Sequence, residues 1–350
     1  MKIAVLLSGG VDSSVALKLL RRDKEHEITA FYLKIWLEDE LAHLGECPWE
    51  DDLRFAREIC SEARVPLEIV PLQKEYYERV VSYTITELRA GRTPSPDIFC
   101  NQRIKFGAFV DSVSSSFEKV ASGHYGRIAE EGGTFRLLKG VDPIKDQTYF
   151  LSHLRQEQVA RCLFPIGDLL KSEVRRLASD YELPNRTRAD SQGICFLGKI
   201  SFNDFVRYHL GEERGDIVER ETGKVLGSHQ GFWFHTIGQR KGLGLSQGPW
   251  YVVGKDVDKN VVTVSHSQHL EEHARDTFDV AAAHWVHGPP GREDLTAKLR
   301  HSEVLYDCRL ESKGEERFTV TLDRSDAGVA PGQFAVFYDG EECLGGARIV

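Results

Sequence analysis

The sequence predicts an α/β fold, with a doubly wound parallel sheet in the first 200 residues and antiparallel β structure after it. Two observations support this prediction. Apolar strand-like runs alternate with helical patterns up to about residue 200, as they do in βαβ units. From about Gly211 onward the helical patterns fade, and short alternating runs separated by Gly and Asp turns replace them, which is typical of a small barrel.

Eight segments of the first half justify the α/β prediction. Strands are expected at residues 2–7 (KIAVLL), 28–36 (ITAFYLKIW), 67–72 (LEIVPL) and 119–123 (KVASG). Helices are expected at residues 15–22, 52–63, 75–91 and 104–116, the third ending at Gly91. Because a doubly wound sheet binds its ligands at the carboxyl ends of its strands, the loop after residues 2–7 is a candidate site.

The second half is expected to consist of strands alone, in two groups. The alternating runs lie at residues 231–238 (GFWFHTIG), 250–257, 260–265, 278–286, 317–322 and 333–340. A polar segment beginning at His266, HSQHLEEHARD, is unlike a strand. It predicts a boundary near residues 266–275.

Composition places the chain among soluble globular proteins and excludes several classes of site. Apolar residues make up 41% and charged residues 28%. The sequence contains no run of 18 apolar residues, so no membrane span is predicted. The apolar run at the N-terminus is too short for a signal peptide. The seven cysteines include no C-x-x-C pair, which argues against a zinc site or a disulfide framework. A cytoplasmic protein with reduced thiols is expected.

The net charge of −9 argues against a nonspecific nucleic-acid binder. Much of this charge is local, since residues 38–62 hold nine acidic residues and two arginines. Small basic clusters remain elsewhere: Lys171, Arg175 and Arg176; Arg186 and Arg188; Arg240 and Lys241; Lys298 and Arg300. Each cluster alone predicts a solvated surface rather than a phosphate contact.

The loop SGGVDSS, which starts at Ser8, directly follows the first predicted strand and opens the first helix. Such a loop presents backbone N–H groups and a helix N-terminus to an anion, and Gly9 and Gly10 allow close approach. The lysine of the Walker loop is absent, and Asp12 stands in the loop instead. Asp12 could bind Mg²⁺ or cap the helix, and the residues alone leave both open.

The string SGGVDSS resembles the pyrophosphate loop of the ATP pyrophosphatase family. Those enzymes cleave ATP between the α and β phosphates and transfer AMP to a carbonyl oxygen. The resemblance implies an ATP site with Mg²⁺ as a second cofactor and Asp12 as its ligand. The implied ATP-binding residues of the loop are Leu6, Leu7, Ser8, Gly9, Gly10, Val11, Asp12 and Ser13.

Further strings resemble the tRNA-specific 2-thiouridylases almost from end to end. They are GRTPSPDIFCNQRIKFG from Gly91, ASGHYGRI from Ala121, KDQTYFL from Lys145, DSQGICFLG from Asp190, HTIGQRKGLG from His235, PWYVVGKD from Pro249 and PGQFAVFYDGEECLGGARI from Pro331. The resemblance implies a nucleotide-binding catalytic domain (1–200), a small central domain (201–270) and a C-terminal antiparallel β-barrel (271–350). It also implies ATP-dependent 2-thiolation of the wobble uridine of tRNA.

This reaction replaces the C2 oxygen of uridine, a poor leaving group, with sulfur. Adenylation converts that oxygen into a good leaving group, and a thiol that carries transferable sulfur then supplies the nucleophile. The resemblance implies Cys195, in GICF, as the persulfide carrier and Cys100, in PDIFCN, as the second catalytic cysteine. Without it, either cysteine would be interpreted as a buried core thiol. Delivery of the sulfur as free hydrosulfide or directly from the persulfide remains open.

The resemblance also implies the remaining site residues. Asp97, three positions before Cys100, could accept a proton or orient the uridine, next to Ser95 and Pro96. Ser95 replaces the family's usual Asn. Leu33 and Gly123 match nucleotide contacts. Contacts with tRNA are implied for Lys145, Asp146 and Gln147 and for Arg300 and His301, where His301 departs from the family's usual Tyr.

The implied partners are tRNA and a sulfur donor, either a sulfur-carrier protein or a cysteine desulfurase, without a membrane. Two alternatives come from other classes of protein. A carbonyl-adenylating ligase of the argininosuccinate or GMP synthetase type would use the same loop but needs no paired cysteines. A noncatalytic, nucleotide-responsive RNA-binding module would bind ATP without turnover that depends on tRNA.

Overall fold

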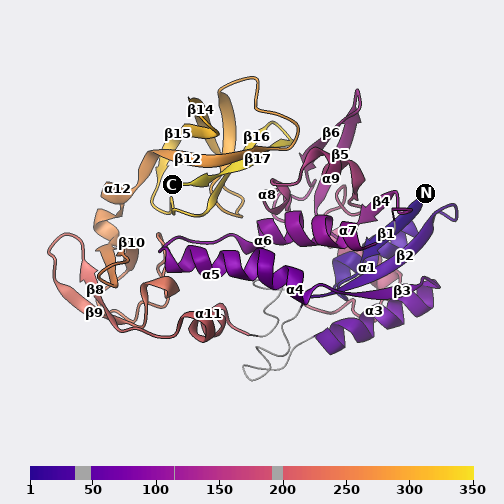
Figure 1. Ribbon diagram of the computed structural model, residues 1–350, viewed down its shortest axis with the longest axis horizontal. Coiled ribbons are helices and arrows are strands. Elements are labelled where there is room, and N and C mark those ends of the chain that lie inside the picture. Colours follow the sequence, from indigo (N-terminus) through magenta and orange to yellow (C-terminus); the bar gives the residue numbers. More distant parts are fainter. Residues whose placement is uncertain (36–48, 114, 191–199) are drawn as a thin grey trace.

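The computed structural model describes residues 1–350 except 36–48, 114 and 191–199 (Figure 1). The end of the second predicted strand, at Trp36, and the predicted persulfide carrier Cys195 lie outside the described residues. In the described part of the chain, no helix is both long enough and apolar enough to span a membrane.

Five parallel strands form the first sheet, in the order β3-β2-β1-β4-β7. They are β1 (Lys2–Leu6), β2 (Glu27–Lys34), β3 (Leu67–Pro71), β4 (Lys119–Ala121) and β7 (Cys162–Leu163). The four strands predicted for this half are confirmed, whereas β7 was not predicted. The chain winds outward from β1 to β2 and β3 and then returns to β4, so the order reverses between β1 and β4, the topological switch point.

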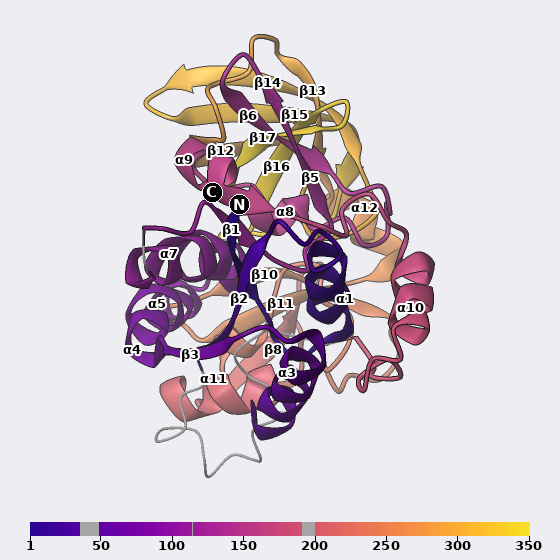
Figure 2. The ribbon, with the colours of Figure 1, turned by 90° about the vertical axis from the view of Figure 1, so that its right-hand side faces the viewer.

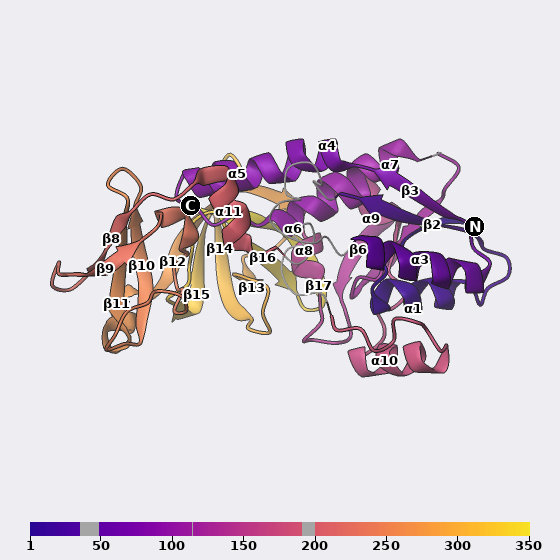
Figure 3. The ribbon, with the colours of Figure 1, turned by 90° about the horizontal axis from the view of Figure 1, so that it is seen from below.

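Side chains of β1 alternate between two hydrophobic cores, as the period of a strand requires. Ile3 and Val5 join one core and Ala4 and Leu6 the other. The first core is completed by α1 (Val11–Leu20), α3 (Trp49–Ala63) and α10 (Lys171–Asp180). Figures 2 and 3 both show α10 lying beside α1. The second core is covered by the helices α4 (Gln73–Tyr76), η2 (Tyr77–Val81), α5 (Ser82–Arg89), α6 (Pro96–Phe99), η3 (Cys100–Ala108) and α7 (Phe109–Ser112).

The helices depart from the prediction in two ways. The segment predicted as a helix at 104–116 begins earlier, at Pro96, which occupies the first turn where a proline is tolerated. Several helices were not predicted: α10, α8 (Thr148–Leu151), α9 (Gln156–Arg161) and α11 (Phe202–Leu210). The predicted stop at Gly91 is confirmed, because α5 ends at Arg89 and Gly91 has a φ of +72°.

The central region contains a four-stranded sheet in the order β10-β11-β8-β9. Its strands are β8 (Gly215–Glu219), β9 (Val225–His229), β10 (Trp250–Asp256) and β11 (Val261–His266). The antiparallel prediction is wrong for one pair, because β11 and β8 run parallel. The predicted strand at 231–238 is also wrong. Gly231 has a φ of +136°, and the chain turns into a short helix, η4 (Phe232–Phe234), that buries Phe232 and Trp233.

The polar boundary segment forms η5 (Ser267–His269) and α12 (Leu270–His273), and a closed antiparallel barrel follows. Its order is β12-β15-β14-β13-β16-β17, and β12 pairs with β17 to close it. The strands are β12 (Arg275–Trp285), β13 (Asp294–Lys298), β14 (Tyr306–Gly314), β15 (Arg317–Asp326), β16 (Phe334–Asp339) and β17 (Glu342–Ile349). The predicted C-terminal barrel is therefore confirmed, while the boundaries at residues 200 and 270 stay predictions.

One hairpin of the first domain extends the sheet of the barrel. It consists of β5 (Gly126–Glu131) and β6 (Thr134–Lys139), and β6 pairs antiparallel with β17 (Figure 1). The same junction contains a buried ion pair, in which Lys298 Nζ lies 2.9 Å from Asp146 Oδ2. Both side chains are at most 4% exposed. This pair therefore joins the first domain to the barrel.

Substitution of Lys298 by Met should strongly destabilise the protein. Removing one partner of a buried pair leaves the other charge buried and uncompensated, which costs about 3–5 kcal/mol. Urea unfolding followed by tryptophan fluorescence measures the loss. The matched control is Lys313→Met, because Lys313 also pairs with an aspartate, Asp279, at 2.7 Å, but both side chains are about half exposed. The control should cost about 1 kcal/mol or less, and equal losses in the two variants would contradict the prediction.

Stability should also fall below neutral pH because of His153, a buried histidine stacked on His284. Burial, together with the nearby His284 and Arg103, lowers the pKa of His153 to about 3. Between that pKa and the ordinary value of 6.5, the unfolded chain binds a proton that the folded chain does not. Stability is therefore lost as the pH falls below 6.5, by about 2 kcal/mol at pH 5.

Urea unfolding at pH 7 and pH 5 tests this dependence, and His153→Asn should flatten it by roughly the same 2 kcal/mol. His269→Asn, on the surface in α12, is the control and should keep the wild-type fall. An unchanged pH dependence in His153→Asn would refute the assignment.

Candidate active site

The predicted anion loop lies between β1 and α1, at the switch point of the sheet. Gly9 has a φ of +75°, and an added Cβ would collide with the backbone of Asp52. Gly123, just after β4, approaches the loop from the other side: a Cβ there would lie 2.6 Å from the backbone nitrogen of Ser13. Both glycines are therefore required by close backbone approach, and Gly123 packs directly against the loop.

Serine hydroxyls brace the loop from within. Ser13 Oγ and Ser14 Oγ both donate to the carbonyl oxygen of Gly10, at 3.1 and 2.7 Å. Ser13 Oγ also accepts from the backbone N–H of Ser8, at 3.3 Å. Gly10 is the residue before α1 and has no side chain to cap the helix. The first N–H groups of α1 therefore face the loop opening, where they suit an anion.

Apolar members of the predicted nucleotide set support the loop. Leu6, Leu7 and Val11 are at most 8% exposed and belong to the cores on either side of β1. Leu33, near the carboxyl end of β2, pairs in register with Val70 and is partly buried. These positions place Leu33 at the same edge of the sheet as the loop, and its nucleotide contact stays a prediction.

Asp12 is held by two residues distant in sequence rather than by the helix end. Lys171 Nζ lies 2.7 and 2.8 Å from its two carboxylate oxygens, and the hydroxyl of Tyr125 donates to Oδ1 at 3.0 Å. Burial, followed by the charge of Asp12, raises the pKa of that Tyr125 hydroxyl. The cation absent from the loop is thus supplied by Lys171, the first residue of α10.

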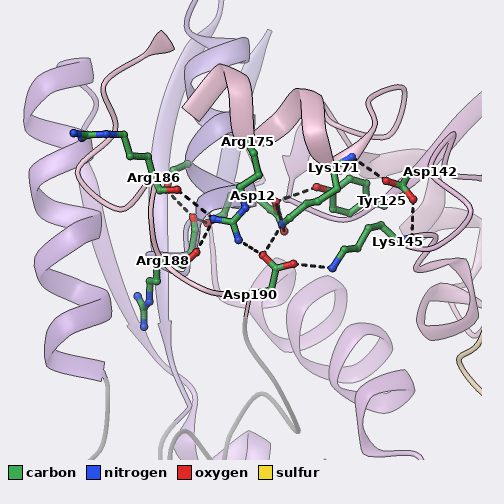
Figure 4. A network of polar contacts seen from close by, with 12 residues as sticks. Asp12, Tyr125, Asp142, Lys145, Lys171, Arg175, Arg186, Arg188 and Asp190 are labelled. Atoms are coloured by element: carbon green, nitrogen blue, oxygen red, sulfur yellow. Dashed lines mark hydrogen bonds and ion pairs between the residues drawn. The ribbon is translucent and has the colours of Figure 1, made fainter. Parts of the chain in front are cut away.

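Figure 4 shows that Lys171 belongs to a larger network centred on Asp190. Asp190 pairs with Lys171 at 2.8 Å, with Lys145 at 2.7 Å and with Arg175. Burial alone would raise the pKa of Asp190, but hydrogen bonds from Lys145 and Lys171 hold it well below its usual value. Lys171 is only 14% exposed, so the predicted solvated surface is wrong for this residue.

A second group of residues fastens the loop to the segment before Asp190. Asn185 is buried, and its Nδ2 donates to Gly9 O at 2.8 Å and to Ser14 Oγ at 3.0 Å. Arg188 donates to Gly9 O at 3.3 Å and pairs with Asp52. Burial raises the pKa of Asp52, and Arg188 opposes that rise. Sequence reasoning missed Asn185 and assigned Arg188 to a solvated cluster, because their partners lie more than 130 positions away in the chain.

Cys100 begins the π-helix η3, directly after α6. π-helical segments are rare and often occur at functional sites. The Cys100 side chain is 1% exposed, and the other four cysteines of the described residues, Cys60, Cys162, Cys308 and Cys343, are buried as well. Burial alone therefore does not distinguish Cys100 from these four, and its catalytic role stays a prediction together with that of Cys195.

A cavity of about 770 Å³ opens where the helices around α6, the central region and the barrel meet. Its wall includes five of the residues predicted to contact tRNA: Ser95, Pro96, Asp97, Arg300 and His301. Residues of the central region, among them Trp233, Phe234 and Lys241, also line it. The fold therefore gathers two predicted strings that are 200 positions apart into one cavity.

Arg300 and His301 are fixed at the cavity wall by their own contacts. Arg300 donates to both carboxylate oxygens of Asp326, at 3.1 and 2.6 Å. His301 lies over Phe150 with ring centroids 4.5 Å apart, and its Nε2 lies 3.1 Å from the carbonyl oxygen of Asp146. Burial lowers the pKa of His301 and so favours its neutral form. The His301 ring, tilted by 33° to that of Phe150, lines the cavity.

The string Lys145–Gln147 does not line this cavity. Lys145 pairs with Asp190, and Asp146 pairs with Lys298 in the interior. Gln147 Oε1 accepts from the backbone N–H of Tyr125 at 3.0 Å. All three side chains hold intramolecular contacts, and their predicted contacts with tRNA remain untested.

The described residues offer phosphate a better fit than they offer a metal ion. They contain no group of three or more His, Cys, Asp or Glu side chains placed to hold a metal. Mg²⁺ often binds through one carboxylate plus substrate phosphates, so Asp12 alone meets the minimum requirement. The glycine-lined loop, the start of α1 and the nearby cations fit a polyphosphate.

Family models match each of the three parts of the chain, and relatives that match over the full chain share one description. The family models that match are a tRNA methyl transferase HUP domain at residues 1–199, a tRNA methyl transferase PRC-barrel domain at 203–266 and an aminomethyltransferase beta-barrel domain at 275–349. A tRNA-specific 2-thiouridylase of Bacteroides thetaiotaomicron is 45% identical over 100% of this chain and 99% of its own length. Enzymes with the same description from Porphyromonas gingivalis and Parabacteroides distasonis are 44% and 43% identical, with equal coverage.

Substitution of Gly123 by Ala should weaken ATP binding while leaving the fold intact. The added Cβ meets the backbone of Ser13, which must shift and disturb the loop. Equilibrium binding of ATP, without tRNA, should weaken by roughly tenfold, since about 1.4 kcal/mol is lost. Gly291→Ala is the control because a Cβ there meets open space. Wild-type affinity in a folded Gly123→Ala protein would show that Gly123 does not shape the nucleotide site.

Proposed function

The chain belongs to the family of tRNA-specific 2-thiouridylases and is an ATP-using tRNA sulfurtransferase, and from this premise we propose how it thiolates the wobble uridine. The uridine C2 oxygen attacks the α-phosphate of ATP, pyrophosphate leaves, and the base becomes adenylated. Sulfur from a persulfide on Cys195 then takes the place of the oxygen, and AMP leaves.

One observation carries this proposal: the anion loop and the segment that leads to Cys195 share a single polar network. Lys171 contacts Asp12 in the loop and Asp190, which opens the string DSQGICF. Cys195 follows Asp190 by five positions in the sequence. The nucleotide site and the sulfur-carrying string are thus tied to the same lysine, as a reaction that couples ATP cleavage to sulfur transfer requires.

The loop residues have a defined role in the adenylation step. Backbone N–H groups at the start of α1 and the cations Lys171 and Arg188 stabilise the negative charge of the departing pyrophosphate. Mg²⁺ would bind phosphate oxygens and the carboxylate of Asp12, and it would supply further positive charge. No residue of the chain needs to change its covalent state in this step.

Two thiols are needed for the sulfur step. The persulfide of Cys195 delivers its terminal sulfur, either directly to C2 or as hydrosulfide released by attack of Cys100. In both routes the Cys100 thiolate attacks sulfur bonded to Cys195, and each delivered sulfur leaves one Cys100–Cys195 disulfide for an external thiol to reduce. Because Cys100 is 1% exposed in this structure, binding of tRNA must expose its thiol.

The cavity lined by residues 95–97 and 300–301 suits the target nucleotide. Asp97 would orient the base near Cys100, Arg300 would contact phosphate and His301 would stack on a base. The sulfur that forms the persulfide on Cys195 would come from a sulfur-carrier protein or a cysteine desulfurase. The relatives are described as thiouridylases over the full chain, which favours the sulfurtransferase over the ligase and the noncatalytic module.

Cys195→Ser and Cys100→Ser should each abolish thiolation of tRNA while ATP binding persists. Each variant lacks one thiol of the sulfur step, whereas the loop is unchanged. Mass analysis of nucleosides from tRNA incubated with the protein, ATP, Mg²⁺ and a persulfide source measures the product.

The control is Cys60→Ser, in α3, where burial raises the pKa of the Cys60 thiol to about 11 and keeps it unreactive. This variant should retain thiolation. Full thiolation by Cys195→Ser would disprove the assignment of the persulfide carrier.

A further inference from the structure

We propose that Lys171, Lys145 and Arg175 form the cationic half of the ATP phosphate site, and that the Asp190 carboxylate occupies this half as an internal counter-anion until nucleotide replaces it. The inference rests on the proposed ATP chemistry and extends the phosphate site from Lys171 to Lys145, Arg175 and Asp190. Lys171 would then bind the nucleotide directly, and Asp190 would compete with the nucleotide for Lys171. Neither residue would be only part of a static structural network.

The geometry of Asp190 resembles that of a bound anion. Its Oδ1 contacts both Lys171 and Arg175, and its Oδ2 contacts Lys145 at 2.7 Å (Figure 4). The three cations come from three places in the chain: the string at 145–147, the first residue of α10 and the middle of α10. Converging positive side chains of this kind bind phosphate as readily as carboxylate.

This cluster directly adjoins the anion loop. Lys171 Nζ bridges the two sides, because it contacts Asp12 of the loop at 2.7 Å and Asp190 at 2.8 Å. A phosphate group at the start of α1 therefore meets the same lysine. Two independent anion-binding features, a helix N-terminus with open N–H groups and a triad of cations, thus share one ammonium group.

Each cation is held in place by something other than Asp190. Asp142 accepts from the backbone N–H groups of Lys145 and Lys171, at 3.1 and 2.9 Å, and so fixes the two lysine backbones. Arg175 donates to the carbonyl oxygens of Arg186 and Arg188, at 3.2 and 2.6 Å. Loss of Asp190 from the cluster would therefore leave Arg175 and the backbones of the two lysines close to their present positions.

Exposure distinguishes this network from a structural ion pair. Lys171, Arg175 and Lys145 are 14%, 32% and 35% exposed, and Asp190 is 25% exposed. In contrast, Lys298 and Asp146 are 4% and 2% exposed. An incoming polyphosphate can reach the first network but not the second. Phosphate also brings more negative charge than one carboxylate, so it competes effectively for the same donors.

The test is equilibrium binding of ATP, and of inorganic pyrophosphate, to the full chain without tRNA or a sulfur donor. Lys171→Met should weaken binding by about ten- to a hundredfold, because it removes a charge-assisted contact with phosphate. Lys171→Arg should restore part of the loss. Asp190→Asn should instead tighten binding, by roughly three- to tenfold, because it removes the internal competitor. Weaker ATP binding in Lys171→Met together with tighter ATP binding in Asp190→Asn would indicate that Asp190 competes with the nucleotide for Lys171.

Lys18→Met is the matched control. Lys18 lies in the last turn of α1, is 18% exposed and pairs with Glu62 at 3.5 Å, so it resembles Lys171 in burial and charge but lies away from the loop. It should bind ATP like the wild type. Circular dichroism of every variant confirms the fold before binding is compared.

Three other results would contradict the inference or its premise. Wild-type affinity in Lys171→Met would remove Lys171 from the phosphate site and from its proposed role in the adenylation step, whereas thiolation that depends on Cys195 and Cys100 would still support the overall reaction. Weaker binding in Asp190→Asn would show that Asp190 supports the site rather than competing for it. Absence of ATP binding by the wild-type protein would instead overturn the proposed function itself.

Discussion

The buried ion pair between Asp146 and Lys298 sets the relative position of the two functional regions. Its two ends belong to different parts of the chain, the string at 145–147 and the strand β13 of the barrel. On one side of Asp146, Lys145 reaches the network at the anion loop. On the other side, the carbonyl oxygen of Asp146 contacts His301 at the cavity wall. The segment around Asp146 thus connects the network at the anion loop with the cavity.

A buried pair is costly unless its remaining hydrogen-bonding capacity is satisfied. Here Asp146 Oδ1 accepts from the Thr148 hydroxyl at 2.7 Å and from the backbone N–H of Gly140 at 3.2 Å, while Oδ2 faces Lys298. Pairing of β6 with β17 closes the same junction by backbone hydrogen bonds. This arrangement fixes how the two domains pack, because any shift between them would leave a buried charge without its partner.

Local sequence patterns predicted four strands of the first sheet, the anion loop and the barrel, because each depends on side chains close together in the chain. Gly91 ended its helix as expected, since a glycine adopts positive φ without strain. The failures depend on distant partners. The apolar pattern at 231–238 also suits a short buried turn, and only packing around Phe232 and Trp233 decides between the two. Lys171 looked solvated because Asp12 lies 159 positions away. The cavity gathers residues 95–97 and 300–301 through the closure of the barrel, which no local pattern encodes.

Separation of the loop from its lysine has a chemical consequence. In a Walker loop the lysine and the phosphate-binding backbone belong to one short segment, so the conformation of the loop determines the position of the cation. Here the lysine is mounted on α10 and has two carboxylates within reach. In the proposed reaction, Lys171 would return to Asp12 and Asp190 when pyrophosphate departs, and no unpaired charge would be left in a partly buried site. A cation that has carboxylate partners nearby suits a leaving group that must first be bound and then released, because the cation is paired both before and after release.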